Sequence, residues 1–285
     1  MNTVTKTARA KINLSIDVVG KLENGYHLVR MVMVQVDIAD YVTVTLRGDG
    51  EITLSSDDRN MPLDETNLAY RAAEKFLHAV GRPELGCHIY IEKHIPMGAG
   101  MAGGSTDAAG VINGLNELLG SPLSLERRME IGVKLGADVP YCIHGGCVLA
   151  EGIGEKLTAL KEPPKVYYVV AKPKRSVSTK WVYEHLDFSK KPQGLNIDGL
   201  VEAIGKGDLE EMYGCMGNVL ENVSVPECPE IAEYKADLAA LGADFSLMSG
   251  SGSAVFGMFK TAEGAKAAYE QFVKAHPEAE GVWLV

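Results

Sequence analysis

The strongest chemical signal in the chain is the stretch Pro96-Met97-Gly98-Ala99-Gly100-Met101-Ala102-Gly103-Gly104-Ser105-Thr106-Asp107. A strand-like run precedes it and a helix-like run follows it. Glycine lets the backbone approach an anion closely, and the first turn of a helix offers unpaired N–H groups with a partial positive charge. The stretch therefore predicts a phosphate-binding loop, with Ser105, Thr106 and Asp107 as candidate caps of the following helix.

Three rival interpretations of this loop carry less weight. Gly98, Gly100 and Gly103 match the dinucleotide pattern G-x-G-x-x-G, but no acidic residue ends a following strand about 20 residues later. The P-loop pattern requires a lysine where Gly104 stands. The third interpretation is a flexible loop without a ligand, which the density of glycine at a helix start disfavours.

The N-terminal segment is predicted to form strands. Between Ala8 and Ile16 the apolar residues fall at even positions, so Lys11, Asn13 and Ser15 share the other face. A lysine on a strand is most often exposed to solvent. Lys11, however, lies among small and apolar residues beside Asn13, which makes it a candidate for a functional site.

The rest of the chain mixes helices and strands without strict alternation. Further strands are expected at 28–36, 41–46, 51–55, 87–93, 166–171, 282–285 and on both sides of Gly250-Ser251-Gly252-Ser253. Helices are expected at 67–79, 108–119, 125–135 and from Ala262 onward. The pair Pro163-Pro164 favours a boundary, so we predict an α+β fold with domains at 1–162 and 163–285.

The segment Gly136-Ala137-Asp138-Val139-Pro140 has two interpretations. Asp138 either caps a short helix with a proline near its start, or acts as a base toward a substrate hydroxyl. Phosphoryl transfer depends mainly on positioning and charge stabilisation. A carboxylate, a lysine such as Lys11 and a glycine-rich loop would therefore suffice for a kinase that uses ATP.

Composition narrows the classes of partner. The formal net charge is −10, which argues against nucleic acid but not against an anionic small molecule. The sequence has neither a long apolar run nor a basic and apolar N-terminus, so we expect a cytoplasmic protein without a membrane partner. The odd number of cysteines predicts free thiols, and Cys142, His144 and Cys147 lack a second ligand pair, so no metal site is expected.

Several motifs occur together in one order and cover nearly the whole chain. They are Ala10–Leu14, Asp17–Gly20, Asn24-Gly25-Tyr26-His27, Pro96–Thr106, Leu135–Pro140, Glu151–Glu155 and Met248–Phe256. Together they resemble the GHMP kinases, the superfamily of galactokinase, homoserine, mevalonate and phosphomevalonate kinases. Within it, they are most similar to the kinase of non-mevalonate isoprenoid biosynthesis that phosphorylates a cytidine diphosphate-linked alcohol.

The resemblance implies a two-domain fold with the active site in the interdomain cleft, a monomer or homodimer, and ATP with Mg²⁺ as cofactors. It implies Asp138 as catalytic base and Lys11 as its partner. The ATP-binding residues that it implies are Asn67, Lys93, Pro96, Gly98, Gly100, Gly103, Gly104, Ser105 and Thr106. The substrate-binding residues that it implies are Asn13, Tyr26, His27, Thr179, Tyr183 and Gly250.

The chain departs from the family pattern at a few positions. Ala99 and Ala102 stand where relatives often carry glycine, and Tyr183 stands where phenylalanine is expected. Two other functions remain open: another GHMP kinase of the homoserine or mevalonate type, which Asn24-Gly25-Tyr26-His27 disfavours, and a nucleotide-binding sensor without catalysis, which the retention of Lys11 and Asp138 disfavours.

Overall fold

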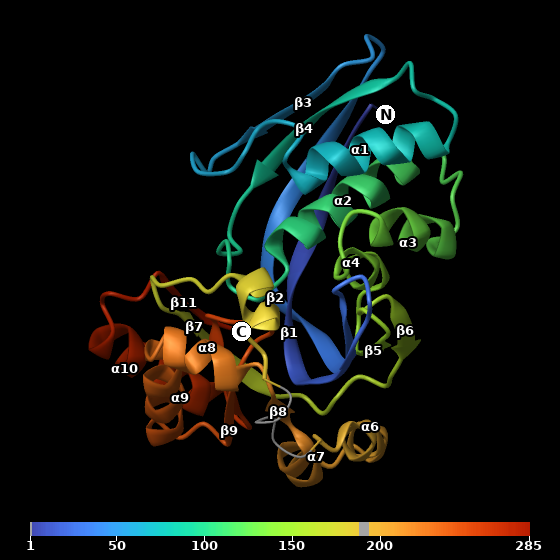
Figure 1. The fold of residues 1–285 in the computed structure, drawn as a ribbon. Helices are drawn as coiled ribbons and strands as arrows, with labels where there is room; N and C mark the ends of the chain where they lie inside the picture. The colour runs from blue at the N-terminus through green and yellow to red at the C-terminus, as the bar shows by residue number, and fades with distance from the viewer. Residues whose placement is uncertain (1, 188–193) are drawn as a thin grey trace. The chain divides into compact units, whose positions relative to one another are not determined.

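The computed structural model describes residues 2–187 and 194–285. Two long strands come first, β1 (Thr3–Lys21) and β2 (His27–Arg47), joined by a turn (Figure 1). In that turn Leu22 N donates to Tyr26 O at 2.7 Å, and Gly25 has a φ of +87°, which suits glycine. The predicted break between two strands at residues 37–40 is absent, because β2 runs through it.

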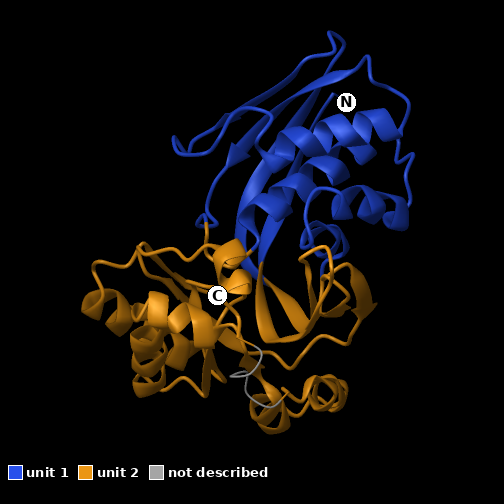
Figure 2. Ribbon diagram, viewed as in Figure 1, with its two compact units in different colours: residues 1–10, 36–97, 102–145 blue, residues 11–35, 98–101, 146–285 orange. Residues whose placement is uncertain are grey.

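The chain forms two compact units that are not contiguous in sequence (Figure 2). Unit 1 comprises residues 1–10, 36–97 and 102–145, and unit 2 comprises 11–35, 98–101 and 146–285. Strands β1 and β2 therefore each contribute residues to both units. The sequence division at 162/163 concerns domains along the chain and stays a prediction.

Unit 1 combines a sheet with helices on one of its faces (Figure 1). Strand β4 (Gly86–Glu92) pairs antiparallel with β2 and parallel with β3 (Ile52–Ser56). The helices are α1 (Leu68–Ala79), α2 (Gly103–Leu118), α3 (Leu125–Val133) and α4 (Val139–His144). A Cβ on Gly110 would lie 3.0 Å from Val42, so glycine allows α2 to pack closely on the sheet.

Unit 2 contains the hairpin of β5 (Val148–Glu151) and β6 (Lys156–Ala159), which pairs through β5 with β2. The short strand β8 (Gly217–Asn218) runs parallel to β1. A second sheet has the order β11-β7-β10-β9 and is antiparallel throughout. Its strands are β7 (Tyr167–Lys172), β9 (Phe245–Met248), β10 (Val255–Phe259) and β11 (Gly281–Leu284).

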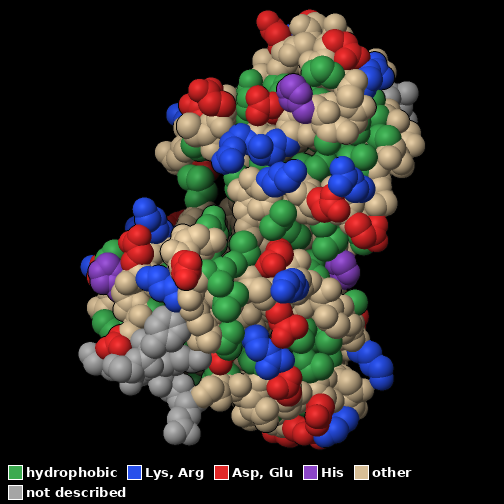
Figure 3. Space-filling model, turned by 45° about the vertical axis from the view of Figure 1, so that its right-hand side comes forward, with side chains coloured by type: hydrophobic (Ala, Val, Ile, Leu, Met, Phe, Trp, Pro, Cys, Tyr) green, Lys and Arg blue, Asp and Glu red, His purple; other side chains and the backbone are tan. Residues whose placement is uncertain are grey.

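The helices of unit 2 are mostly short. They are α5 (Thr179–Glu184), α6 (Ile197–Lys206), α7 (Leu209–Cys215), α8 (Glu221–Glu227), α9 (Glu230–Ala240) and α10 (Ala262–Ala275). Helices α9 and α10 pack on the second sheet. None of the helices in the described residues is long and apolar enough to cross a membrane. On the face shown in Figure 3, acidic and basic side chains are interspersed with hydrophobic ones.

Helices and strands mix without strict alternation in both units, which confirms the predicted α+β class. The predicted helices α1, α2, α3 and α10 and the predicted strands around residues 250–253 are present within a few residues of their expected ends.

Candidate active site

Helix α2 begins at Gly103, near the end of the glycine-rich loop, but its N-cap differs from the one predicted. Its N-cap is Ala102, which has a left-handed φ of +62° and makes no side-chain cap. Ser105, Thr106 and Asp107 therefore lie inside the helix, and the prediction that one of them caps it is wrong. The first backbone N–H groups of α2 have no partners within the helix, so they can bind an anion.

The residues in the first turn of α2 differ in burial and in their contacts. Thr106 is buried, and its Oγ1 donates to the backbone oxygen of Arg9 at 2.9 Å, which fastens α2 to β1. Gly104 is exposed and Ser105 is half-buried. A Cβ on Gly103 would lie 3.2 Å from Ile95 and 3.6 Å from Lys93 Nζ, so this turn lies directly against both residues.

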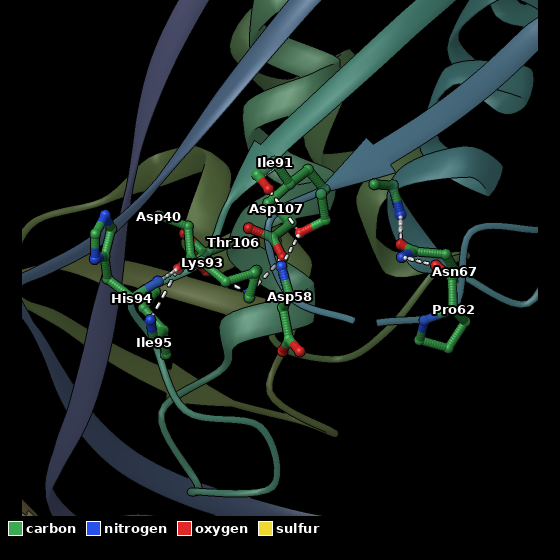
Figure 4. A network of polar contacts seen from close by, with 12 residues as sticks. Asp40, Asp58, Pro62, Asn67, Ile91, Lys93, His94, Ile95, Thr106 and Asp107 are labelled. Carbon is green, nitrogen blue, oxygen red and sulfur yellow. Dashed lines mark hydrogen bonds and ion pairs between the residues drawn. The ribbon is translucent and has the colours of Figure 1, made fainter. Parts of the chain in front are cut away.

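Lys93 lies in a buried ionic cluster of unit 1 rather than on the surface (Figure 4). Its Nζ donates to Asp40 Oδ2 at 2.5 Å and to Asp107 Oδ2 at 2.8 Å. Burial alone would lower the pKa of Lys93, but the two carboxylates outweigh it and raise that pKa. The ammonium is thus engaged inside the protein, and the predicted role of Lys93 toward ATP stays a prediction.

Asn67 caps α1 (Figure 4). Its Oδ1 accepts from Ala69 N at 2.8 Å, and its Nδ2 donates to Pro62 O at 2.8 Å. Both functions of the amide are therefore used within unit 1, and a contact from Asn67 to ATP stays a prediction. Pro96, the first residue of the loop motif, is half-buried in the same unit.

Asp138 immediately precedes α4, at the N-cap position, with Pro140 in the first turn. Its side chain accepts no capping hydrogen bond from the helix, although its position would allow one. The carboxylate is half-buried. The capping interpretation of Asp138 is therefore not supported, and its role as a base stays a prediction.

In unit 2, Lys11 is buried and does not lie on a solvent-exposed face. Its Nζ donates to Asn13 Oδ1 at 2.6 Å and to the backbone oxygen of Gly100 at 2.8 Å. The oxygen of Gly100 also accepts from Ser249 Oγ at 3.1 Å. Lys11 thus joins the first strand to both glycine-rich segments within this unit.

The second glycine-rich segment packs against this lysine. Gly250 has a φ of +57°, and a Cβ on it would lie 3.3 Å from both Lys11 Nζ and Asn13 Oδ1. Asn218 fixes the segment, because its Nδ2 donates to Met248 O at 2.9 Å and to Gly250 O at 2.7 Å. Asn218 belongs to none of the sequence motifs, and the contacts of both Asn218 and Ser249 are with residues distant in the chain.

Gly98 and Gly100 both adopt left-handed conformations, with φ of +63° and +74°. A Cβ on Gly98 would make an ordinary contact with Ser176 Oγ at 3.4 Å, whereas a Cβ on Gly100 would lie 2.1 Å from Ser249 O. The loop thus depends on Gly100 for a close backbone contact and on Gly98 only for its conformation.

The residues expected on the substrate side also lie in unit 2. The rings of His27 and Tyr183 lie 5.2 Å apart, and Tyr26 is 56% exposed. Burial, and then the charge of Lys21, lowers the pKa of His27, which favours the neutral ring. Thr179 Oγ1 is 2.7 Å from Ser251 Oγ, next to Gly250. The structure thus places the rings of His27 and Tyr183 side by side, and the roles of these residues toward a substrate stay predictions.

The cysteines are free thiols. Burial raises the pKa of Cys87 and Cys147 to about 12 and that of Cys228 to about 11. These thiols are therefore protonated at neutral pH and poorly nucleophilic.

The donor chemistry of this chain suits a phosphate ligand. Within unit 1, the N–H groups at the start of α2 could bind a phosphate. Within unit 2, taken by itself, the Lys11 ammonium beside left-handed glycines has the same donor chemistry. An aromatic pair in unit 2 additionally offers a face to a flat base.

Comparison with known proteins adds independent information. The family model described as the GHMP kinases N terminal domain matches residues 67–146, and the model described as GHMP kinases C terminal matches residues 200–278. The chain is 46% identical over 284 residues to a 4-diphosphocytidyl-2-C-methyl-D-erythritol kinase of Lachnoclostridium phytofermentans, covering 100% of this chain and 97% of the relative. The kinase of the same name from Alkaliphilus metalliredigens is 46% identical over 270 residues, covering 95% of this chain and 92% of the relative.

Solved structures of GHMP kinases also match this chain over nearly its full length. A crystal structure of 4-(cytidine 5'-diphospho)-2C-methyl-D-erythritol kinase matches with a TM-score of 0.80 and 33% identity, covering 99% of this chain and 98% of that chain. A homoserine kinase from Cytophaga hutchinsonii matches with a TM-score of 0.79 at 20% identity, covering 100% of this chain and 94% of that chain, and this likeness concerns the fold alone.

Proposed function

Because the chain belongs to the GHMP kinase family, we propose that it transfers the γ-phosphoryl group of ATP to the 2-hydroxyl of 4-diphosphocytidyl-2-C-methyl-D-erythritol, in non-mevalonate isoprenoid biosynthesis. The observation that carries the proposal is the 46% identity over 284 residues with a kinase of that name. The pairing of the His27 and Tyr183 rings supports an acceptor that carries a flat base.

In the proposed reaction, Asp138 accepts the proton of the acceptor hydroxyl. The oxygen then forms a bond to the γ-phosphorus as the bond to ADP breaks. Lys11 stabilises the negative charge that develops on the transferring group, and the N–H groups at the start of α2 bind phosphate oxygens. Mg²⁺ accompanies the nucleotide and neutralises part of its charge, and we assign it no ligand from this chain.

This assignment requires Asp138 and Lys11 to act as one catalytic pair. If they do, Asp138→Asn and Lys11→Met each lower kcat strongly. The kcat of the double variant is then hardly lower than that of the less active single variant, because the effects of substituting groups that act as a unit are not additive. Asp237→Asn serves as a control, since it removes a carboxylate on α9 that pairs with His276 at 2.8 Å. Additive losses in the double variant would contradict a joint role.

The substrate is tested by ATP consumption with three acceptors at equal concentration: the cytidine diphosphate substrate, homoserine and mevalonate. We expect turnover with the first alone. A uridine analogue then tests recognition of the base, because a site that pairs with cytosine leaves polar groups unpaired when uracil replaces it. Equal use of both bases would contradict the cytidine assignment, and no turnover with any acceptor despite nucleotide binding would favour a non-catalytic sensor.

We expect a monomer or homodimer, which sedimentation of the purified protein would distinguish. The cytoplasmic location also stays a prediction.

A further inference from the structure

The buried cluster of Asp40, Lys93 and Asp107 is unevenly bonded (Figure 4). Asp40 receives three hydrogen bonds: from Lys93 Nζ at 2.5 Å, from His94 N at 2.6 Å and from Ile95 N at 2.8 Å. Asp107 receives one, at Oδ2 from Lys93. Its Oδ1 is buried and has no hydrogen-bond partner in the described part of the chain.

This imbalance identifies the place where the cluster would take up a proton. With both carboxylates ionised, the cluster has one net negative charge, since Lys93 supplies a single positive charge. Burial raises the pKa of Asp107 to about 7; Lys93 opposes that shift and Asp40 adds to it. Oδ1 of Asp107 is the free position for the proton, and Lys93 and Asp40 are the charged groups that act on it.

The cluster lies under the start of α2. Asp107 is in the fifth position of that helix, and Gly103 opens it with its Cα close to Lys93, as a Cβ there would lie 3.6 Å from Nζ. The N–H groups of this first turn are the ones that suit phosphate. A negative charge on Asp107 therefore opposes the same anion that the turn attracts.

We propose that Asp107 is a positioning residue for the nucleotide, which holds Lys93 beneath the first turn of α2, and that binding of the nucleotide phosphates is coupled to uptake of a proton at Asp107 Oδ1. This inference rests on the proposed function, because it takes the first turn of α2 as the phosphate site. The proton comes from solvent, and the cluster changes from one net negative charge to neutral. By linkage, the protonated protein must then bind the nucleotide more tightly than the ionised one.

The test is the affinity for ADP at about pH 6 and about pH 8 in the wild type and in Asp107→Asn. Asparagine keeps the shape and the hydrogen bond to Lys93 but cannot ionise. We expect the wild type to lose about fivefold more affinity than the variant between these pH values, which is the change that a rise of about one unit in the pKa of Asp107, from about 7, produces over this range. Because the terminal phosphate of ADP also titrates, the difference between the two proteins is the measure.

Asp57→Asn is the matched control. Asp57 is exposed, and its Oδ1 accepts from the backbone N of Lys93 at 2.9 Å, so it is a carboxylate near the same lysine but outside the buried cluster. This variant should show the pH dependence of the wild type. If Asp107→Asn shows that dependence as well, the inference is wrong.

A second measurement needs no variant. Calorimetry of ADP binding to the wild type at about pH 8, in two buffers of different ionisation enthalpy, reports protons taken up, and a phosphate monoester is already ionised there. Net proton uptake supports the inference. If no protons are taken up, the inference is wrong, and this result holds even if Asp107→Asn fails to fold. If ADP does not bind at any pH, the proposed kinase function fails instead, so the two failures are distinguishable.

Discussion

Gly100 offers the sharpest test of how the glycine-rich loop is built. In Gly100→Ala the new Cβ would lie 2.1 Å from Ser249 O and 3.1 Å from Gly252 N, both backbone atoms. Ordinary contacts are about 3.5 Å, so the loop must move by about 1 Å or more. The left-handed φ of +74° adds about 1–2 kcal/mol for a residue with a side chain.

The movement also affects two hydrogen bonds. Gly100 O accepts from Lys11 Nζ at 2.8 Å and from Ser249 Oγ at 3.1 Å. A hydrogen bond from a charged donor contributes about 1.5–3 kcal/mol and a neutral one about 1 kcal/mol. With partial loss of both, we expect Gly100→Ala to lower the free energy of unfolding by about 3–5 kcal/mol. A shift of about 1 Å at Lys11 should lower kcat by about a hundredfold.

Gly98→Ala is the matched control in the same loop. Gly98 has a similar φ of +63°, but its Cβ would meet only the side chain of Ser176, at 3.4 Å or more. Ala102 already adopts a φ of +62° in this protein, so alanine tolerates the conformation. We expect a loss of about 1 kcal/mol in urea unfolding and a kcat within a few-fold of the wild type. Equal losses of stability and kcat in the two variants would refute the reasoning.

Four further outcomes are expected. Asp138→Asn should abolish turnover while ADP still binds in a calorimetric titration, and loss of ADP affinity would point to a structural role. Gly103→Val should weaken ADP binding by about tenfold or more, because the side chain would press on Ile95 and block the amides of the turn; unchanged affinity in a folded variant would contradict this. Since burial and Lys21 lower the pKa of His27, the neutral form persists at neutral pH, and KM for the acceptor should rise only as the pH falls below about 6.5. Serine in place of each cysteine in turn should leave turnover intact, and a loss in a stable variant would reopen a thiol role.

The sequence predicted those elements whose stabilising contacts join residues close together in the chain. Helix α10 has a threonine cap at Thr261, whose Oγ1 accepts from Gly264 N, and its buried residues recur at helical spacing, so its start was predictable. The turn ending at Gly25 was predictable for the same reason, since its hydrogen bonds join Leu22 with Gly25 and with Tyr26. The fold class followed from such elements taken in order.

The errors arose where a distant residue changes what a local pattern means. Separate strands were expected at 28–36 and 41–46, yet β2 is continuous through the residues between them. Asp40 is buried there because Lys93, which lies 53 positions further along the chain, provides the opposite charge. The start of α2 was misjudged because alanine rarely adopts a left-handed φ, and Ala102 does so in this loop.

An acidic protein with a net charge of −10 can favour a polyanion only if positive groups are fixed at the binding site. In unit 1 the oriented N–H groups of α2 provide a partial positive charge, but the carboxylate of Asp107 lies in the same helix. Lys93 offsets one of the two buried carboxylates, and a proton on Asp107 would offset the other. The field at the start of this helix is thus set by buried groups with defined partners, and not by the exposed lysines of the surface. It follows that the protonation of one residue can change the attraction for phosphate, although the total charge of the protein is large and negative.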